Sequence, residues 1–343
     1  MATSIGWALT RYARQEALFG PAAQARLSRA TVSVIGAGGL GSPALLYLAG
    51  AGVGTVRIFD DDVVSRSNLH RQIIHADAAV GTPKAASAQH AIAALNPSVA
   101  VEKRGRLTPD TALAQLAGTD VLVDGSDNLH SRYLCSWAAH RLHIPHVWAS
   151  ILGFDAQLSV FYSGHGPVYE DVFPDMPAPG AVPSCSQAGV LGPVVGTVGS
   201  AMALETLKLL TGVGTPLIGQ LGYLDGLTGK WEYVPLRAGG AVPTQPAAPP
   251  EVRTIPAGAR VIDVRTATER AEGFIPGSQH FPLADIQAGQ SPALAPHEPA
   301  VIYCATGVRS AKAVDLLRAR GFTDVVSLRG GFSAWEEDNH SPS

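Results

Sequence analysis

The chain has 343 residues and a formal net charge of −3, with 46% hydrophobic and 15% charged residues. That length favours two domains over one, and the composition supplies enough apolar side chains for two cores. A small negative charge gives no sign of a nucleic-acid or membrane surface, and three cysteines cannot form a disulfide framework. Residues 1–10 lack the basic flank and apolar run of a signal peptide, and Gly and Pro interrupt every apolar stretch. We therefore expect a soluble, cytoplasmic protein with no membrane span.

The most informative stretch runs from residue 31 to residue 72. Residues 31–35 form a β-branched run typical of a buried strand, and an apolar helical segment reaches Ala51. Glycines in this setting permit a tight turn, let backbone N–H groups approach a phosphate and allow a helix to pack close to the sheet. The sequence therefore predicts a nucleotide site on the glycines between strand and helix, which are Gly36, Gly38, Gly39 and Gly41.

A second strand, residues 55–59, ends in three aspartates about twenty residues beyond the glycines. An acidic side chain at this distance, Asp60 or Asp62, would bind ribose hydroxyls. The glycine spacing alone is typical of an NAD-dependent oxidoreductase, which is therefore one alternative.

The residues that follow favour ATP. Asn68, Arg71 and Gln72 lie in one short segment, and Lys84 stands at the start of an expected helix. Backbone amides can hold the paired phosphates of a dinucleotide, whereas the departure of pyrophosphate from ATP calls for cations such as Arg71 and Lys84.

Asp127 and Asn128 follow a third apolar strand, residues 121–123. Open α/β sheets bind ligands at the carboxyl ends of their strands, so Asp127 could hold Mg²⁺ and Asn128 could contact the nucleotide. Taken alone, Asn128 is also typical of a helix cap.

Strands and helices alternate through the first half, which predicts a doubly wound, mostly parallel α/β sheet of the Rossmann type. Residues 217–236 contain two strand-like runs around an Asp-Gly turn and predict a late antiparallel hairpin. Residues 239–251 are rich in Pro and Ala and predict a semi-extended linker. The expected domains are thus residues 1–238 and a smaller α/β domain, residues 252–343.

The three cysteines differ in their surroundings. Cys135 lies in an apolar helical segment and is expected to be a buried core thiol. Cys185 precedes an apolar helix at residues 192–210, and a helix N-terminus would favour its thiolate. Cys304 follows a strand at residues 300–303 and opens a loop that leads into an expected helix at residues 311–320, where backbone N–H groups would stabilise a thiolate or an anionic persulfide.

Together these motifs resemble the MoeB and ThiF family of adenylating enzymes, relatives of ubiquitin-activating enzymes. The matching segments are GAGGLGSP, FDDDVVSRSNLHRQ, VGTPKA and DGSDNLHSR. Asp263-Val264-Arg265, the Cys304-x-x-Gly307-x-Arg309 loop and Gly330-Gly331 look like a rhodanese domain, so the arrangement is similar to the MoeZ type. The resemblance implies ATP- and Mg²⁺-dependent adenylation of the C-terminal glycine of a ubiquitin-like sulfur carrier protein. Sulfur from a persulfide on Cys304, in a loop that also holds Arg309, would then give a thiocarboxylate.

The resemblance also implies roles for single residues. Arg14 matches an arginine that reaches the ATP phosphates of a partner subunit, which implies a homodimer. Cys185 matches a cysteine that can bond covalently to the carrier and could resolve the acyl-persulfide. Zinc-containing relatives carry two Cys-x-x-Cys pairs, whereas Val168 and Asp171 stand where the first pair would fall, so we expect no zinc.

Several alternatives stay open from the residues themselves. An activating enzyme for ubiquitin-like protein conjugation would use Cys185 but leave Cys304 without a purpose. A non-enzymatic scaffold would explain neither the clustered cations nor the cysteine loop. The sulfur donor could be a small molecule or a protein.

Overall fold

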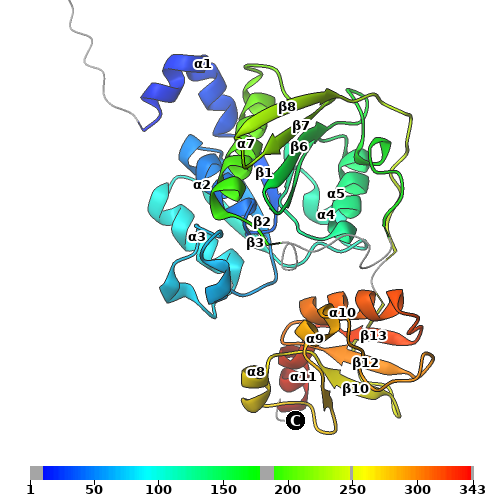
Figure 1. Cartoon of the computed structure of the whole chain (residues 1–343). Coiled ribbons are helices and arrows are strands. Elements are labelled where there is room, and N and C mark those ends of the chain that lie inside the picture. The colour runs from blue at the N-terminus through cyan, green and yellow to red at the C-terminus, as the bar shows by residue number, and fades with distance from the viewer. Residues whose placement is uncertain (1–10, 178–188, 248–249, 341–343) are drawn as a thin grey trace, which may run out of the picture. The chain divides into compact units, whose positions relative to one another are not determined.

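The computed structural model describes residues 11–177, 189–247 and 250–340, which fall into two compact units (Figure 1). Unit 1 comprises the described residues up to Met176 and from residue 189 to Pro246, and unit 2 comprises Pro177 and the described residues from Ala247 onward. The first part of the predicted linker is bonded to unit 1. The backbone N–H groups of Gly239 and Ala241 donate to Asp171 Oδ1 at 2.8 and 3.0 Å. The last linker residue, Glu251, begins a strand of unit 2.

Unit 1 contains an eight-stranded sheet in the order β3-β2-β1-β4-β5-β6-β7-β8. β1 to β5 pair in parallel, and β6, β7 and β8 each add an antiparallel strand. The mostly parallel sheet and the late antiparallel hairpin predicted from the sequence are confirmed. The strands are β1 (Thr31–Ile35), β2 (Thr55–Phe59), β3 (Ala100–Arg104), β4 (Val121–Asp124), β5 (His146–Leu152), β6 (Asp155–Phe161), β7 (Gln220–Asp225) and β8 (Lys230–Pro235).

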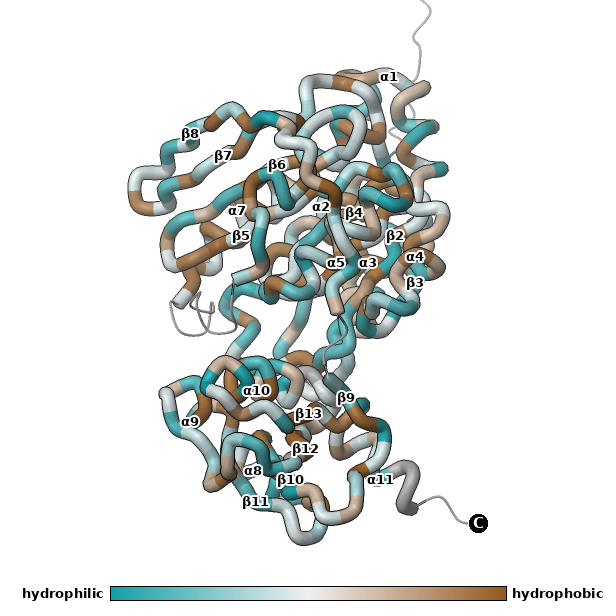
Figure 2. The backbone as a smooth tube through the Cα atoms, turned by 90° about the vertical axis from the view of Figure 1, so that its right-hand side faces the viewer, coloured by the Kyte–Doolittle hydropathy of each residue, from teal (hydrophilic) through white to brown (hydrophobic). Residues whose placement is uncertain are grey.

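Helices cover both faces of this sheet (Figures 1 and 2). The described residues of unit 1 form three hydrophobic clusters, of which the smallest is the aromatic cluster of Tyr133, Trp148, Phe161 and Tyr169. α1 (Ala13–Leu27), α2 (Gly41–Ala51), α3 (Lys84–Leu95) and α7 (Gly192–Thr211) belong to one face, and α4 (Ala112–Leu116) and α5 (Leu129–Leu142) to the other. Short 3-10 helices are η1 (Arg66–Asn68), η2 (Asp77–Ala79) and η3 (Tyr169–Asp171).

Among the described helices, α7 alone is long and apolar enough to cross a membrane by length and composition. Half of that stretch is buried inside the structure. Its buried apolar residues, Val194, Val195, Val198, Met202 and Ala203, belong to the same hydrophobic cluster as α2 and the central strands, which is the pattern of a core helix.

The strand order of unit 1 reverses at β1, which lies between β2 and β4. In an open α/β sheet, ligands bind beyond the carboxyl ends of the strands at such a reversal. The glycine loop follows β1, the aspartates follow β2, and residues 125–128 follow β4. The fold therefore brings the three predicted nucleotide-binding segments to one edge.

Unit 2 contains a five-stranded parallel sheet in the order β11-β10-β12-β13-β9. Its strands are β9 (Glu251–Val252), β10 (Arg260–Asp263), β11 (Gln279–His280), β12 (Ala300–Tyr303) and β13 (Val325–Leu328). Its helices are α8 (Ala267–Ala271), α9 (Leu283–Gln287), α10 (Val308–Ala319) and α11 (Gly331–His340).

Candidate active sites

The glycine loop after β1 owes its shape to close backbone packing. Gly36 has φ +87°, a conformation that side chains disfavour, and its N–H donates to Phe59 O at 2.8 Å. A Cβ on Gly41 would overlap the carbonyl oxygen of Gly36. A Cβ on Gly125, after β4, would lie 3.1 Å from the backbone nitrogen of Gly41. The loop, the start of α2 and the end of β4 are thus in direct contact.

The other two predicted glycines face different neighbours. A Cβ on Gly39 would lie 2.8 Å from Val195 Cγ1 of α7 and 3.8 Å from Arg71 Cδ. The nearest atom to a Cβ on Gly38 would be Gln72 Nε2, at 3.6 Å. The predicted Arg71 and Gln72 therefore lie beside the glycine loop.

The aspartates after β2 connect the glycine loop to α3. Asp60 Oδ2 accepts a hydrogen bond from Ala37 N at 2.7 Å, and its Oδ1 accepts one from Asp62 N at 2.9 Å. Lys84 Nζ donates to Asp62 Oδ2 at 2.7 Å from a side chain that is only 8% exposed. Burial raises the pKa of Asp60 to about 6, against the opposing charge of Lys84. A carboxyl group with this pKa can exchange a proton near neutral pH.

Arg71 lies on the turn that follows η1. The backbone N–H groups of Arg71 and Gln72 both donate to Asn68 O, at 3.1 and 3.0 Å. Arg71 Nη1 lies 3.1 Å from Ser67 O and 2.8 Å from His70 Nε2. Asn68 therefore shapes the turn through its carbonyl, while the guanidinium of Arg71 stays partly exposed beside the loop.

His75 belongs to this site although sequence reasoning passed over it. Its ring is buried, with Nε2 2.9 Å from Ala37 O and Nδ1 2.9 Å from Ser87 Oγ. Burial lowers the pKa of His75, which favours the neutral ring. The sequence offered one signal, because His75 lies three residues after the predicted Gln72. Its contact with Ala37 joins residues 38 positions apart and depends on the fold.

The loop after β4 is anchored by Asp124. Asp124 Oδ1 accepts hydrogen bonds from Ser126 N at 3.0 Å and Ser126 Oγ at 2.6 Å. Asn128 Oδ1 accepts a hydrogen bond from Ser131 N at 2.8 Å and caps α5. The cap was the alternative reading of Asn128, and its contact with a nucleotide stays a prediction. Asp127 is exposed at the same sheet edge, where its carboxylate could hold Mg²⁺.

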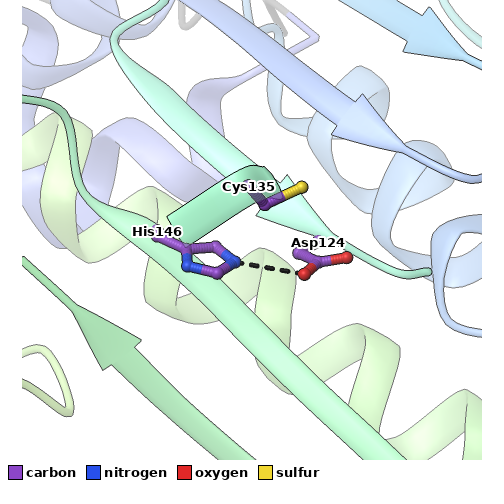
Figure 3. Close-up of side chains that lie close together, drawn as sticks. All are labelled: Asp124, Cys135 and His146. Atoms are coloured by element: carbon purple, nitrogen blue, oxygen red, sulfur yellow. Dashed lines mark hydrogen bonds and ion pairs between the residues drawn. The ribbon is translucent and has the colours of Figure 1, made fainter. Parts of the chain in front are cut away.

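Asp124, Cys135 and His146 form a buried cluster beneath this loop (Figure 3). One potential metal-ligating atom from each lies within 4.8 Å of the others. His146 Nε2 lies 3.2 Å from Asp124 Oδ2. Burial raises the pKa of the Cys135 thiol well above its usual value, and the nearby Asp124 raises it further. The contact between His146 and Asp124 helps to hold the loop, and the predicted burial of Cys135 is confirmed.

The cysteine loop of unit 2 begins where β12 ends. Cys304 Sγ accepts a hydrogen bond from Gly307 N at 3.1 Å, and Ser310 Oγ lies 3.6 Å from it. Ser310 Oγ also lies 2.8 Å from Ser327 Oγ, so two hydroxyl groups stand behind the sulfur. A backbone N–H and a hydroxyl group therefore face the sulfur of Cys304. Cys304 is fully buried, so a reactant reaches Sγ only when the surrounding groups move.

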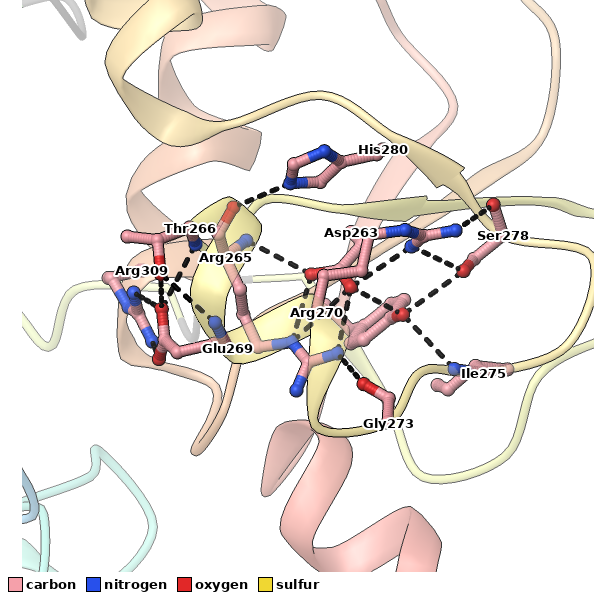
Figure 4. A network of polar contacts seen from close by, with 11 residues as sticks. Asp263, Arg265, Thr266, Glu269, Arg270, Gly273, Ile275, Ser278, His280 and Arg309 are labelled. Carbon is pink, nitrogen blue, oxygen red and sulfur yellow. Dashed lines mark hydrogen bonds and ion pairs between the residues drawn. The ribbon is translucent and has the colours of Figure 1, made fainter.

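Arg309, in the first turn of α10, points to α8 (Figure 4). Its guanidinium forms a bidentate ion pair with Glu269, with Nη1 donating to Oε2 at 2.8 Å. On the adjacent strand, Asp263 accepts hydrogen bonds from Arg265 Nη2 at 2.8 Å and Tyr303 OH at 2.8 Å. The sequence predicted a catalytic Arg309 but did not show its partner, which lies 40 residues away.

Family models match both units of the chain. The ThiF family model matches residues 12–240, and the rhodanese-like domain model matches residues 249–338. The first match covers more than half of the chain.

The chain belongs to the ThiF family.

Relatives of this ThiF-family chain include two-domain and one-domain proteins. It is 41% identical to a Mycobacterium tuberculosis protein named "Probable adenylyltransferase/sulfurtransferase MoeZ", over 95% of this chain and 92% of the relative. It is 48% identical to the sulfur carrier protein adenylyltransferase of Thermus thermophilus, over 67% of this chain and 88% of the relative. The resemblance to the MoeZ type, with its rhodanese half, is therefore confirmed.

Solved structures support the fold of unit 1. A crystal structure of E. coli MccB with ATP covers 67% of this chain and 72% of its own, with a TM-score of 0.59 and 18% identity. At that identity the match concerns the fold alone.

Two predicted residues lie apart from these clusters. Arg14 is exposed near the start of α1, and its role in a partner subunit's site stays a prediction. Cys185 falls outside the residues that the structure describes, so its catalytic role also stays a prediction.

Proposed function

We propose that this enzyme uses ATP to adenylate the C-terminal carboxylate of a ubiquitin-like sulfur carrier protein and then transfers sulfur to it from a persulfide on Cys304. The observation that carries this proposal is the presence of both sites on one chain. A candidate nucleotide site lies at the switch point of unit 1, and Cys304, whose sulfur accepts a backbone hydrogen bond, lies at the end of β12 in unit 2. The likeness to MoeZ extends over both units.

The first step takes place on unit 1. A carboxylate oxygen of the carrier attacks the α-phosphorus of ATP, and pyrophosphate leaves with the electrons of the broken P–O bond. Arg71 and Lys84 offset the charge of the departing pyrophosphate, with Arg14 contributed by a partner subunit in a homodimer. Asp127 would hold Mg²⁺, which shields the phosphate oxygens when bound.

In the second step, the persulfide of unit 2 reacts with the carrier that unit 1 has adenylated. The terminal sulfur of the Cys304 persulfide attacks the activated carbonyl carbon, and AMP leaves. The product is an acyl-persulfide that links the carrier to Cys304. A thiol, which we assign to Cys185, attacks Cys304 Sγ and releases the carrier thiocarboxylate. This leaves a disulfide, and an external thiol reductant must restore both cysteines for another cycle.

The covalent use of Cys185 alone defines the second candidate function. A relative from Haloferax volcanii named SAMP-activating enzyme E1 is 45% identical over 67% of this chain and 86% of its own. In an enzyme for ubiquitin-like conjugation, Cys185 would carry the activated protein and Cys304 would have no part. Dependence of the product on Cys304 separates the two functions.

The test measures the adenylation step directly. The purified chain is incubated with ATP, Mg²⁺ and a purified ubiquitin-like protein ending in Gly-Gly, and pyrophosphate release is followed. We expect release that requires the intact C-terminal glycine of the carrier. Tight binding of NADH, with no pyrophosphate release for any carrier, would overturn the proposal in favour of an oxidoreductase.

A further inference from the structure

The backbone of Ala37, between Gly36 and Gly38 of the glycine loop, is held on both sides. Its N–H donates to Asp60 Oδ2 at 2.7 Å, and its carbonyl oxygen lies 2.9 Å from His75 Nε2. Ala37 is fully buried, and His75 is only 6% exposed. Both contacts are therefore shielded from water, and each fixes one of the two peptide units that meet at Ala37.

The partners of His75 decide which of its ring nitrogens carries the proton. A carbonyl oxygen only accepts hydrogen bonds, so Nε2 must donate to Ala37 O. Burial lowers the pKa of His75 and favours the neutral ring. In that ring Nδ1 is an acceptor, and the hydroxyl group of Ser87, 2.9 Å away, donates to it. Ser87 thus fixes both the tautomer and the orientation of the ring.

A closed chain of contacts joins the glycine loop to α3. Ser87 lies one turn after Lys84, the first residue of α3. Lys84 Nζ donates to Asp62 Oδ2 at 2.7 Å, and Asp62 N donates to Asp60 Oδ1 at 2.9 Å. Asp60 in turn accepts the hydrogen bond from Ala37 N. The loop and the helix that carries Lys84 are therefore fixed to each other by two separate routes, one through the aspartates and one through the histidine.

The hydrogen bond from His75 also sets the direction of a second group. The C=O of Ala37 and the N–H of Gly38 belong to one peptide unit, and the described residues contain no cis peptide bond. In a planar trans unit, these two groups point in opposite directions. Because the carbonyl is held against the buried ring of His75, the N–H of Gly38 is directed away from that ring. Backbone N–H groups of a glycine loop at the carboxyl end of a strand bind phosphate.

We propose that His75 is a positioning residue for ATP: through the carbonyl of Ala37, it directs the N–H of Gly38 toward a phosphate oxygen of the nucleotide. This inference rests on the proposed use of ATP by unit 1. His75 acts through the loop, so its effect depends on the phosphates of the ligand. Loss of the His75 donor should therefore weaken binding of ATP and not of adenosine, which has no phosphate.

The test compares two amide side chains that differ in reach. In His75→Gln, the amide nitrogen can take the place of Nε2 and donate to Ala37 O, whereas in His75→Asn it reaches only the place of Nδ1. The affinities of the full chain for ATP and for adenosine are measured by titration calorimetry. We expect His75→Asn to weaken ATP binding by about tenfold or more, which is the effect of one lost hydrogen bond to a charged group, and to change adenosine binding by less than about twofold. His75→Gln should recover most of the ATP affinity.

Ile74→Val is the matched control for packing. Ile74 is the buried neighbour of His75 in the chain and belongs to the hydrophobic cluster that includes Ala37. Loss of one methylene group should lower stability in urea and leave both affinities unchanged.

Three results would overturn the inference while leaving the proposed function intact. They are an unchanged ATP affinity in His75→Asn, an equal weakening of ATP and adenosine binding in that variant, and a His75→Gln variant that binds ATP no better than His75→Asn. The last two would leave the ring with a packing role only. A wild-type chain that does not bind ATP would overturn the proposed function, and this inference with it.

Discussion

In each unit, the candidate site lies at the carboxyl end of a central parallel strand. The charged side chains around the two sites are arranged differently. In both, a loop leaves the carboxyl end of a central strand and leads into a helix, α2 after β1 and α10 after β12. In unit 1, the guanidinium-bearing side chain of Arg71 lies beside the glycine loop, and Lys84 is paired with Asp62. In unit 2, the sulfur of Cys304 is held by a backbone N–H and a hydroxyl group, while Arg309 is paired with Glu269.

This difference matches the anions that the two sites would handle. A triphosphate carries several charges that shift as pyrophosphate leaves, so nearby cations stabilise the transition state. A single sulfur anion needs only short-range dipoles. It follows that a substitution in one unit should abolish the reaction step of that unit and leave the step of the other unit intact.

The largest effect is expected for Cys304→Ala. This variant should form no carrier thiocarboxylate, because no persulfide can form at that position. Its carrier-dependent pyrophosphate release should match the wild type, since unit 1 is unchanged. Mass spectrometry of the carrier and a pyrophosphate assay measure the two steps. Normal thiocarboxylate yield with thiosulfate as the sulfur source would remove Cys304 from the account.

Lys84→Met tests the cation side of the comparison. Removal of the Lys84 ammonium group should slow pyrophosphate release by about a hundredfold, as for other groups that stabilise transition-state charge. Persulfide formation on Cys304 should not change. Lys103→Met, which removes an exposed lysine from β3, is the matched control and should keep both activities. A similar loss in both variants would mean that overall charge, and not Lys84, matters.

Gly41→Ala tests whether close packing fixes the nucleotide loop. The added Cβ meets the backbone of Gly36, which cannot move without disturbing β1, so we expect unit 1 to lose about 3 kcal/mol of unfolding free energy. Gly50→Ala in the same helix meets nothing within 4 Å and should gain about 0.5–1 kcal/mol. Urea unfolding measures both. Equal stabilities for the two variants would show that the loop tolerates a side chain.

Asp60 provides the smallest and most local test. Its pKa rises from 3.8 to about 6 in the folded chain, so the folded state binds the proton more tightly than the unfolded chain. Stability should therefore fall as pH rises through this window, by at most about 3 kcal/mol relative to Asp60→Asn. The Asp60→Asn variant lacks the hydrogen bond from Asp62 N at every pH. Only the change of unfolding free energy with pH is therefore compared between the two proteins. Parallel pH profiles of urea unfolding for the two proteins would contradict the raised pKa.

Much of the fold could be predicted because its signals are local. β1, β2 and β12 begin and end where predicted, since each contains β-branched residues and is bounded on at least one side by glycine, proline or a charged residue. β9 was missed, because two residues carry no periodicity and their pairing with β13 spans the whole unit. α10 begins at Val308, three residues before the predicted start, because the turn at Gly307 with φ +96° leads directly into it.

The sequence showed which residues belong to the two candidate sites, but not which residues they contact. Glycine spacing pointed to the loop of unit 1, and a cysteine after a strand pointed to Cys304. The contacts of His75 with Ala37, and of His146 with Asp124, depend on segments that the fold brings together. Arg309 was predicted as a catalytic cation, while its neutralisation by Glu269 became visible only when α8 and α10 were in place.

Transfer of labelled sulfur is the most direct test of the central claim that unit 2 supplies the sulfur that the carrier receives. Cys304 is first loaded with sulfur-34 from labelled methanethiosulfonate, and free donor is removed. The loaded chain is then mixed with carrier, ATP and Mg²⁺, and the carrier is analysed by mass spectrometry. We predict one labelled sulfur in the carrier thiocarboxylate, formed only when ATP is present. A labelled carrier formed without ATP, or an adenylated carrier that never gains the label, would contradict the account.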